Sequence, residues 1–197
     1  MERFFEKDKI ILTGNPVRQG LRNHHISREE AIRSFGLDPS KKTILIVGGS
    51  LGARTINNCV MEGLDKIKAS GAQFIWQTGK IYIGEARAAV AQAGELPMLH
   101  VTDFISDMAA AYSAADLIIS RAGAGSISEF CLLQKPVILV PSPNVAEDHQ
   151  TKNALALVNK NAALYIKDAA AKEALLDKAV ETVKQPETLE KFKYKYC

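Results

Sequence analysis

The stretch ADLIISRAGAGSISE, residues 115–129, decides the fold of this chain. Its apolar run at 117–119 is bounded by turn residues and is followed, after two glycines, by apolar residues at helical spacing. This order predicts a buried parallel strand that passes through a tight turn at 123–126 into a helix. The first amides of a helix have no partner within it and lie at the positive end of its dipole, so a glycine-rich turn here favours phosphate binding.

The same pattern occurs earlier, in the stretch ILIVGGSLGA at residues 44–53. Two glycine-rich turns from strand to helix in a chain of 197 residues predict a ligand with more than one phosphate. The hydroxyl of Ser50 and the amides around it would then donate hydrogen bonds to a phosphate.

This earlier turn also allows a different interpretation. Gly48-Gly49-Ser50-Leu51-Gly52 fits G-x-S-x-G, the turn that presents the nucleophilic serine of many hydrolases, and Asp116 and His149 follow in the order serine, acid, histidine. Against a hydrolase, the turn follows only one or two predicted strands, and no His-Gly-Gly segment precedes it. We therefore favour phosphate binding, and keep as alternatives a serine hydrolase with Ser50 as nucleophile and a non-catalytic nucleotide-binding module.

Strands and helices alternate along the rest of the chain. A capping box at 27–30 predicts a helix over 27–35, and a short strand is predicted at 9–12. Further strands are predicted at 43–47, 73–77, 98–101, 116–120, 137–140 and 163–166, and helices at 54–70, 82–93, 108–114, 126–133, 150–160 and 169–184. Parallel neighbours need crossover connections, so this order predicts an α/β fold, a Rossmann-like doubly wound parallel sheet with helices on both faces. We expect one domain over 1–197, with a linker and incoming strand at 1–18 and a terminal segment at 185–197.

Composition and charge exclude several classes of protein. A hydrophobic content of 47% is enough for a full core, whereas a net charge of +3 with scattered Lys and Arg gives no basic stripe for nucleic acid. Cys59, Cys131 and Cys197 are an odd set without CxxC spacing, which favours a reducing, cytoplasmic compartment. No apolar run approaches the roughly 20 residues of a membrane span, so any membrane contact is expected to be peripheral. The tail at 191–197 alternates basic and aromatic residues and is expected to be a frayed terminus.

The segments that follow the predicted strands define the expected binding rim. In doubly wound sheets the ligand lies beyond the carboxyl ends of the strands, which places 48–52, 78–80, 102–104, 121–126 and 141–150 along one rim. The segment 123–128 is similar to a dinucleotide fingerprint, but the acidic residue about 20 positions later, Glu147, falls in a polar loop, so no nicotinamide cofactor is expected. The sequence contains no Asp-x-Asp pair for a divalent cation, so we expect donor binding to need no metal.

Two further rim residues each have two interpretations. Ser126-Ile127-Ser128-Glu129 has the pattern of a capping box, in which the carboxylate only returns to the start of the helix. Alternatively, the carboxylate of Glu129 accepts hydrogen bonds from both hydroxyls of a ribose. Arg18, at the end of a turn-rich loop, is either an ordinary surface arginine or a phosphate ligand through its planar fork of donors.

Several motifs taken together resemble one family of glycosyltransferases. They are GNPVR at 14–18, GGSLGAR at 48–54, TDFISDM at 102–108, SRAGA at 120–124 with Ser128-Glu129, and DHQ at 148–150 with Asn153-Ala154. Their order is typical of the MurG family, which transfers N-acetylglucosamine from UDP-N-acetylglucosamine (UDP-GlcNAc) to the lipid-linked N-acetylmuramyl-pentapeptide precursor of peptidoglycan. The resemblance covers only the second half of that family, whose members have a two-domain GT-B fold. It therefore implies a C-terminal donor-binding domain without the N-terminal acceptor domain.

The resemblance also implies a role for each residue that matches a family motif. The donor diphosphate would be contacted by Arg18, Ser50 and the amides around Ala124 and Gly125. Uracil would lie beside Phe104 and Ile105, with Ile105 contributing backbone groups, and the ribose hydroxyls would bind Glu129. The hydroxyls of the sugar would bind Gln150 and Asn153. Some relatives have a polar residue where Leu51 stands and a second glutamine where His149 stands, so no sugar contact is assigned to these two positions.

The mechanism implied by the resemblance is a direct displacement with inversion at the anomeric carbon. The acceptor hydroxyl attacks as UDP leaves, and preorganised donors in this domain stabilise the charge that develops on the diphosphate. Deprotonation of the acceptor would belong to the N-terminal domain, which would also provide peripheral contact with the cytoplasmic face of the bacterial inner membrane. We therefore expect no catalytic residue in this chain, and binding of UDP-GlcNAc or UDP without sugar transfer.

Overall fold

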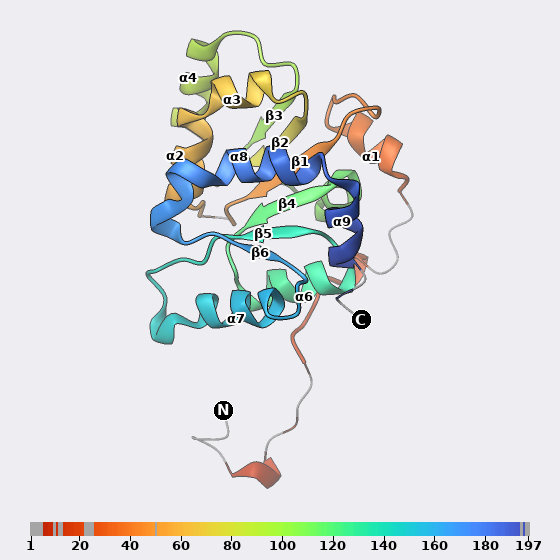
Figure 1. Ribbon diagram of the computed structural model, residues 1–197, viewed down its shortest axis with the longest axis vertical. Helices are drawn as coiled ribbons and strands as arrows, with labels where there is room; N and C mark the ends of the chain where they lie inside the picture. The colour runs from red at the N-terminus through yellow and green to blue at the C-terminus, as the bar shows by residue number, and fades with distance from the viewer. Residues whose placement is uncertain are drawn as a thin grey trace.

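Six parallel strands form the sheet that the sequence predicts. The computed structural model describes residues 6–9, 11, 14–21, 26–49, 51–193 and 195. The strands are β1 (Thr43–Val47), β2 (Gln73–Gln77), β3 (Leu99–Thr102), β4 (Leu117–Ser120), β5 (Val137–Leu139) and β6 (Leu164–Tyr165). Their order is β3-β2-β1-β4-β5-β6, and each neighbouring pair is parallel (Figure 1). The predicted Rossmann-like doubly wound sheet is confirmed.

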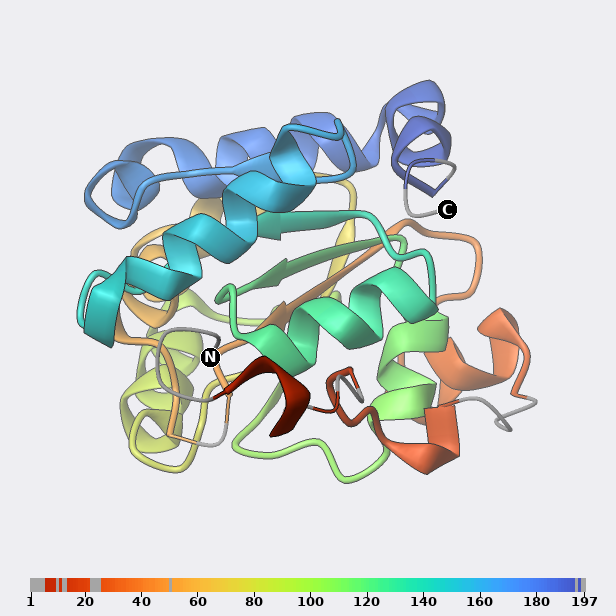
Figure 2. The same ribbon diagram turned by 90° about the horizontal axis from the view of Figure 1, so that it is seen from below.

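Helices cover both faces of this sheet. They are α1 (Arg28–Ser34), α2 (Arg54–Glu62), α3 (Leu64–Ala69), α4 (Ile83–Ala93), α5 (Met108–Ala114), α6 (Ala124–Leu132), α7 (His149–Val158), α8 (Ala171–Val183) and α9 (Pro186–Lys193). Helices α2, α3, α4, α8 and α9 pack on the face that carries Ile44 and Ile46, and α1, α5, α6 and α7 pack on the face that carries Leu45. Figure 2 shows α8 and α6 on opposite sides of the strands. Successive side chains of a strand point to opposite faces, and helices cover both faces, so these strands are apolar at nearly every position.

Helix α1 begins as its capping box predicts. The amide of Glu30 donates to Ser27 Oγ at 3.2 Å, and the amide of Ser27 donates to Glu30 Oε2 at 3.1 Å. Two otherwise unpaired amides are thereby satisfied at the helix start. None of the helices in the described part of the chain is long and apolar enough to cross a lipid bilayer.

The helix predicted at 54–70 is divided into α2 and α3 at Gly63. A Cβ atom on Gly63 would lie 2.1 Å from Cδ1 of Leu176 in α8, so only glycine allows α8 to approach this closely. The Gly63 amide closes α2 by donating to the carbonyls of Cys59 and Val60. The helical pattern on both sides of Gly63 concealed this break, because a single glycine is often tolerated within a helix.

Both ends of the chain differ from the prediction where the structure describes them. Phe192 is 5% exposed and Leu189 packs in the core, so the frayed terminus predicted for 191–197 is wrong at 191–193, where α9 ends. Residues 194, 196 and 197 lie outside the described part. At the other end, Lys9 closes a 3-10 helix (Lys7–Lys9), and the remainder of the strand predicted at 9–12 lies largely outside the described residues.

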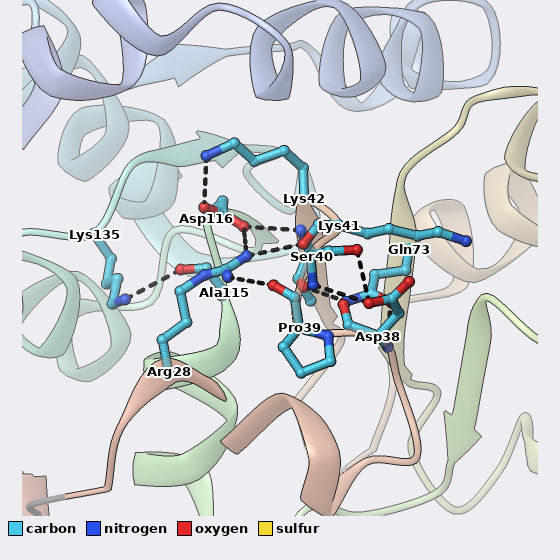
Figure 3. A network of polar contacts seen from close by, with 11 residues as sticks. Arg28, Asp38, Pro39, Ser40, Lys41, Lys42, Gln73, Ala115, Asp116 and Lys135 are labelled. Carbon is cyan, nitrogen blue, oxygen red and sulfur yellow. Dashed lines mark hydrogen bonds and ion pairs between the residues drawn. The ribbon is translucent and has the colours of Figure 1, made fainter. Parts of the chain in front are cut away.

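A polar network fastens α1 and the following loop to the amino ends of β1 and β4 (Figure 3). Asp116 accepts hydrogen bonds from Arg28 Nη2 at 2.7 Å, Lys42 Nζ at 3.0 Å and the Thr43 amide at 2.9 Å. Arg28 also donates to the backbone carbonyls of Pro39 and Lys41. Burial acts to raise the pKa of Asp116, but the bonds from Thr43, Arg28 and Lys42 outweigh it and lower this pKa below its ordinary value.

Candidate functional site

The carboxyl ends of β1 and β4 lie side by side at the centre of the sheet. From β1 the sheet continues outward through β2 and β3, and from β4 it continues in the opposite direction through β5 and β6. Loops on the two sides of this switch point diverge and leave a crevice, which is where doubly wound sheets bind their ligands. The loops at 48–53 and 121–123 both begin here.

Glycines bring the loop after β1 into contact with the loop after β2. Gly52 and Gly79 have φ angles of +84° and +81°, a region that other residues rarely adopt. A Cβ atom on Gly79 would lie 2.3 Å from the Gly52 amide nitrogen, and one on Gly52 would lie 2.4 Å from the Thr78 carbonyl oxygen. Helix α2 then begins after Ala53, and none of the described side chains caps its first amides. The position of Ser50 lies outside the described residues, although Gly49 and Leu51 on either side belong to this loop.

A pocket of about 510 Å³ opens between the segments that follow β1, β4 and β5. Its volume is within the range of about 300–1,000 Å³ that is usual for ligand pockets. Among the predicted site residues that the structure describes, Gln150 lines this pocket, together with Arg121 and the beginning of α2. The complete lining is Gly48, Gly52, Ala53, Arg54, Thr55, Tyr82, Arg121, Ser142, Asn144, Gln150 and Asp168.

Helix α6 begins two residues earlier than predicted. Its N-cap is Gly123, and no side chain in the described part of the chain caps the first turn, which contains Ala124 and Gly125. The capping box predicted at 126–129 is wrong, because these residues lie inside the helix and Ser128 Oγ donates to the Ala124 carbonyl at 3.0 Å. An uncapped first turn at the carboxyl end of β4 is the arrangement that favours an anionic ligand.

Glu129 is a buried carboxylate with two partners. Its Oε2 atom accepts a hydrogen bond from the Tyr112 hydroxyl at 2.7 Å and another from Arg18 Nη1 at 3.1 Å. The Glu129 side chain is 9% exposed, whereas that of Arg18 is 58% exposed. Burial and the bond to Glu129 raise the pKa of Tyr112 far above its ordinary value, so this hydroxyl remains a donor at neutral pH. The structure therefore brings together two residues, Arg18 and Glu129, that are 111 positions apart in sequence.

The segment that carries Arg18 lies against α6. Asn15 Nδ2 donates to Ser128 Oγ at 3.1 Å, and the 3-10 helix Gln19–Leu21 buries Leu21 in the core beside α5. These contacts hold the Arg18 backbone in place while its guanidinium remains largely in solvent. An exposed arginine that is anchored at its backbone can reach a phosphate without costly desolvation of its charge.

Gln150 and Asn153 connect α7 to the loop after β4. Gln150 Oε1 accepts hydrogen bonds from the amides of Ala122 at 3.2 Å and Ser142 at 2.9 Å, and Asn153 Nδ2 donates to the Ala122 carbonyl at 3.1 Å. The two residues predicted to bind sugar thus also order the loop that leads into α6. His149 is the first residue of α7, and Leu51 is 72% exposed on the loop after β1.

Phe104 and Ile105 follow β3 and have opposite exposures. The Phe104 side chain is 54% exposed, while Ile105 is 4% exposed and packs in the core. Thr102 Oγ1 donates to the Phe104 carbonyl at 3.0 Å and orders the loop. Ile105 can therefore offer a ligand only its backbone groups, as expected from the resemblance, and Phe104 can offer an aromatic face.

Comparison with known proteins places this arrangement in a family. The model of the glycosyltransferase family 28 C-terminal domain matches residues 43–195. The chain belongs to this family. A crystal structure of MurG from Acinetobacter baumannii superposes with a TM-score of 0.70 and 30% identity, over 87% of this chain and 48% of that one.

Relatives with higher identity are known from sequence. A protein from Bacteroides fragilis named UDP-N-acetylglucosamine--N-acetylmuramyl-(pentapeptide) pyrophosphoryl-undecaprenol N-acetylglucosamine transferase is 70% identical over 190 residues, which are 96% of this chain and 50% of the relative. A protein of the same name from Bacteroides thetaiotaomicron is 67% identical over 93% of this chain and 50% of the relative. The chain spans about half the length of these curated relatives.

Sequence reasoning missed three residues that shape this family 28 site. Tyr112 binds Glu129, and Arg121 Nη1 donates to the carbonyls of Val140 and Pro141 and to the carboxylate of Asp168. Asp168 also accepts from Thr55 Oγ1 at 2.8 Å, so it links the loop after β4 to α2. Arg121 lies in a rim segment that the sequence does identify, whereas no local pattern marks Tyr112 or Asp168.

The serine hydrolase alternative fails on the position of its acid. Asp116 precedes β4 at the amino end of the sheet, where it is engaged by Arg28, Lys42 and Thr43 (Figure 3). The loop that contains position 50 follows β1 at the carboxyl end. The four residues of β4 separate the two ends by about 13 Å. A triad of Ser50, His149 and Asp116 therefore cannot form.

Proposed function

We propose that this chain is the nucleotide-sugar-binding half of an inverting glycosyltransferase of peptidoglycan synthesis. The complete enzyme would transfer N-acetylglucosamine from UDP-GlcNAc to the lipid-linked N-acetylmuramyl-pentapeptide. The observation that carries this proposal is that relatives named for this transfer are 70% identical across 96% of the chain. A family 28 fold with two uncapped helix starts at its switch point supports it.

In this proposal the donor lies across the crevice between the loops after β1 and β4. The diphosphate binds the first turn of α6 at Ala124 and Gly125, the hydroxyl of Ser50, and Arg18. The sugar enters the pocket lined by Gln150, with Asn153 on the next turn of α7. Amides at the helix starts are fixed before the reaction, so they stabilise the negative charge on the departing UDP without reorganisation.

The nucleoside would lie on the other side of the diphosphate. Glu129 accepts the ribose hydroxyls through the edge of its carboxylate that Arg18 and Tyr112 leave open. Uracil packs by the exposed ring of Phe104 and hydrogen-bonds the backbone of Ile105. Helix amides, hydroxyls and Arg18 supply the charge complement in this arrangement, so donor binding is expected to need no metal cofactor.

The remaining steps belong to the half of the relatives that this chain does not span. That half would bind the lipid-linked acceptor, remove the proton from its hydroxyl and contact the cytoplasmic face of the bacterial inner membrane. The chain by itself should bind UDP-GlcNAc and transfer no sugar. Turnover by the isolated chain with a lipid acceptor would contradict this division of roles.

Calorimetric titration with UDP-GlcNAc tests the proposal directly. UDP-glucose, ADP and NAD serve as comparison ligands, and every titration contains a chelator. Binding that selects uridine ligands and persists with chelator is the expected result. Equal binding of ADP would favour a general nucleotide-binding module, and failure of every uridine ligand to bind would contradict the proposal.

A further inference from the structure

The contact between Tyr112 and Glu129 goes beyond the residues that the family motifs identify. Tyr112 lies in α5 and is 3% exposed, and its ring packs edge-on against Phe130 with ring centroids 5.9 Å apart. Phe130 is the residue after Glu129 in α6, so the ring contact and the hydroxyl contact join the same two helices. Tyr112 is therefore fixed by packing, and its hydroxyl lies within hydrogen-bond distance of Glu129.

The two partners of Glu129 bind the same oxygen atom. Tyr112 and Arg18 both donate to Oε2, and none of the described residues donates to Oε1. A carboxylate accepts several hydrogen bonds, and each bond from a donor that is itself held in place restricts how the group can turn. The donor from Arg18 is exposed, whereas the donor from Tyr112 is buried. Tyr112 is thus the constant element that sets how Glu129 presents Oε1.

We infer that Tyr112 is a positioning residue that orients the Glu129 carboxylate toward the hydroxyls of a ribonucleoside diphosphate, and so sets selectivity for ribose. This inference rests on the proposed function, because it requires the ribose to lie at Glu129. Tyr112 acts through Glu129 and does not touch the ligand. Because its ring is buried against Phe130, the Tyr112 hydroxyl keeps its hydrogen bond to Glu129 whether or not Arg18 has turned toward a phosphate.

The test compares two ligands that differ only in the ribose hydroxyls. UDP and 2′,3′-dideoxy-UDP are titrated against the unsubstituted chain, which is expected to prefer UDP by about tenfold or more. In Tyr112→Phe the Kd for UDP should rise about fivefold, while the Kd for the dideoxy ligand stays within about twofold. A residue that only supports the fold would weaken both ligands equally. Equal weakening, or an unchanged preference for UDP, would overturn the inference.

A matched tyrosine variant and a double variant separate the positioning role of Tyr112 from a general loss of structure. Tyr165→Phe removes the hydroxyl of a half-buried tyrosine in the edge strand β6 and should leave the preference for UDP unchanged. In a Glu129→Gln background, Tyr112→Phe should have little further effect on the ratio of the two Kd values, because the two residues act as one unit. Additive losses in the double variant would overturn the inference.

The outcome for the unsubstituted chain separates this inference from the proposed function. If UDP does not bind, the proposed function fails and the role of Tyr112 fails with it. If UDP and the dideoxy ligand bind equally well, nucleotide binding stands, but the ribose role of Glu129 and the positioning role of Tyr112 are both refuted. If UDP is preferred and Tyr112→Phe keeps that preference, the inference about Tyr112 alone is refuted.

Discussion

At the scale of single residues, the site depends on Glu129, a buried carboxylate that must keep its hydrogen-bond partners. Its side chain is 9% exposed, and it accepts from one buried and one exposed donor. Hydrogen bonds to a charged group contribute about 1.5–3 kcal/mol, so we expect Glu129→Gln to weaken UDP-GlcNAc binding about tenfold or more in calorimetric titration. Glu95→Gln, a change of the same kind in the exposed loop before β3 at the other end of the sheet, should leave the affinity unchanged. Equal affinities of Glu129→Gln and the unsubstituted chain would refute the ribose role.

Arg18 serves as a second residue-scale test because its guanidinium is exposed although its partner Glu129 is buried. Glu129 keeps its hydrogen bond from Tyr112 when Arg18 is replaced, so Arg18→Ala should remain folded. The variant should bind UDP several-fold more weakly but uridine, which has no phosphate, with nearly unchanged affinity. The difference should shrink as salt is added, because the guanidinium is screened. Arg33→Ala on the exposed side of α1 is the matched control, and parallel losses for UDP and uridine would exclude a phosphate contact.

At the scale of elements, the loops after β1 and β2 depend on glycine. Gly52→Ala would place a Cβ atom 2.4 Å from the Thr78 carbonyl oxygen at a φ angle of +84°. We expect it to lower the free energy of unfolding by about 2–4 kcal/mol in denaturant titrations, from overpacking and backbone strain together. Gly84→Ala in α4 meets no neighbour within 4 Å and should instead stabilise the chain by up to about 1 kcal/mol. Similar values for the two variants would show that the loop relaxes around a methyl group.

The elements also show which features a sequence can reveal. The strands, the carboxyl-end rim and the helix at Met108–Ala114 follow from local pattern, because apolar periodicity is a property of neighbouring residues. The start of α6 was misplaced, because Ser126 and Glu129 match a capping box as well as true capping residues do. The close approach of Leu176 to Gly63 and the hydrogen bond from Tyr112 to Glu129 join residues that are distant in sequence, and such contacts leave no local signal.

At the scale of the whole molecule, the carboxyl end of the sheet is suited to ligand binding and the amino end to stability. At the carboxyl end, none of the described side chains caps the first amides of α2 or α6, and Gly123 and Gly125 have open space around them, features that favour binding over stability. The amino end instead satisfies its charges internally, with Asp116 joining α1, the amino end of β1 and the start of β4 (Figure 3). Changes at the amino end should therefore alter unfolding more than ligand affinity.

Asp116 tests this division through pH. The pKa of Asp116 is lower in the folded chain than in the unfolded chain, so the unfolded chain binds the proton more tightly. The contribution of Asp116 to stability is therefore complete above its ordinary pKa of about 4, and it is lost as the pH falls through the folded pKa. We expect Asp116→Asn to lower the free energy of unfolding by about 2–3 kcal/mol at pH 7, with a smaller difference from the unsubstituted chain below about pH 4. Asp177→Asn, which removes an exposed ion pair with Lys66, should change stability by less than about 1 kcal/mol.

Because the network lies at the end of the sheet opposite the crevice, the affinity of Asp116→Asn for UDP should match that of the unsubstituted chain while it remains folded. A lowered affinity at full folding would show that the two ends are coupled through β1 and β4.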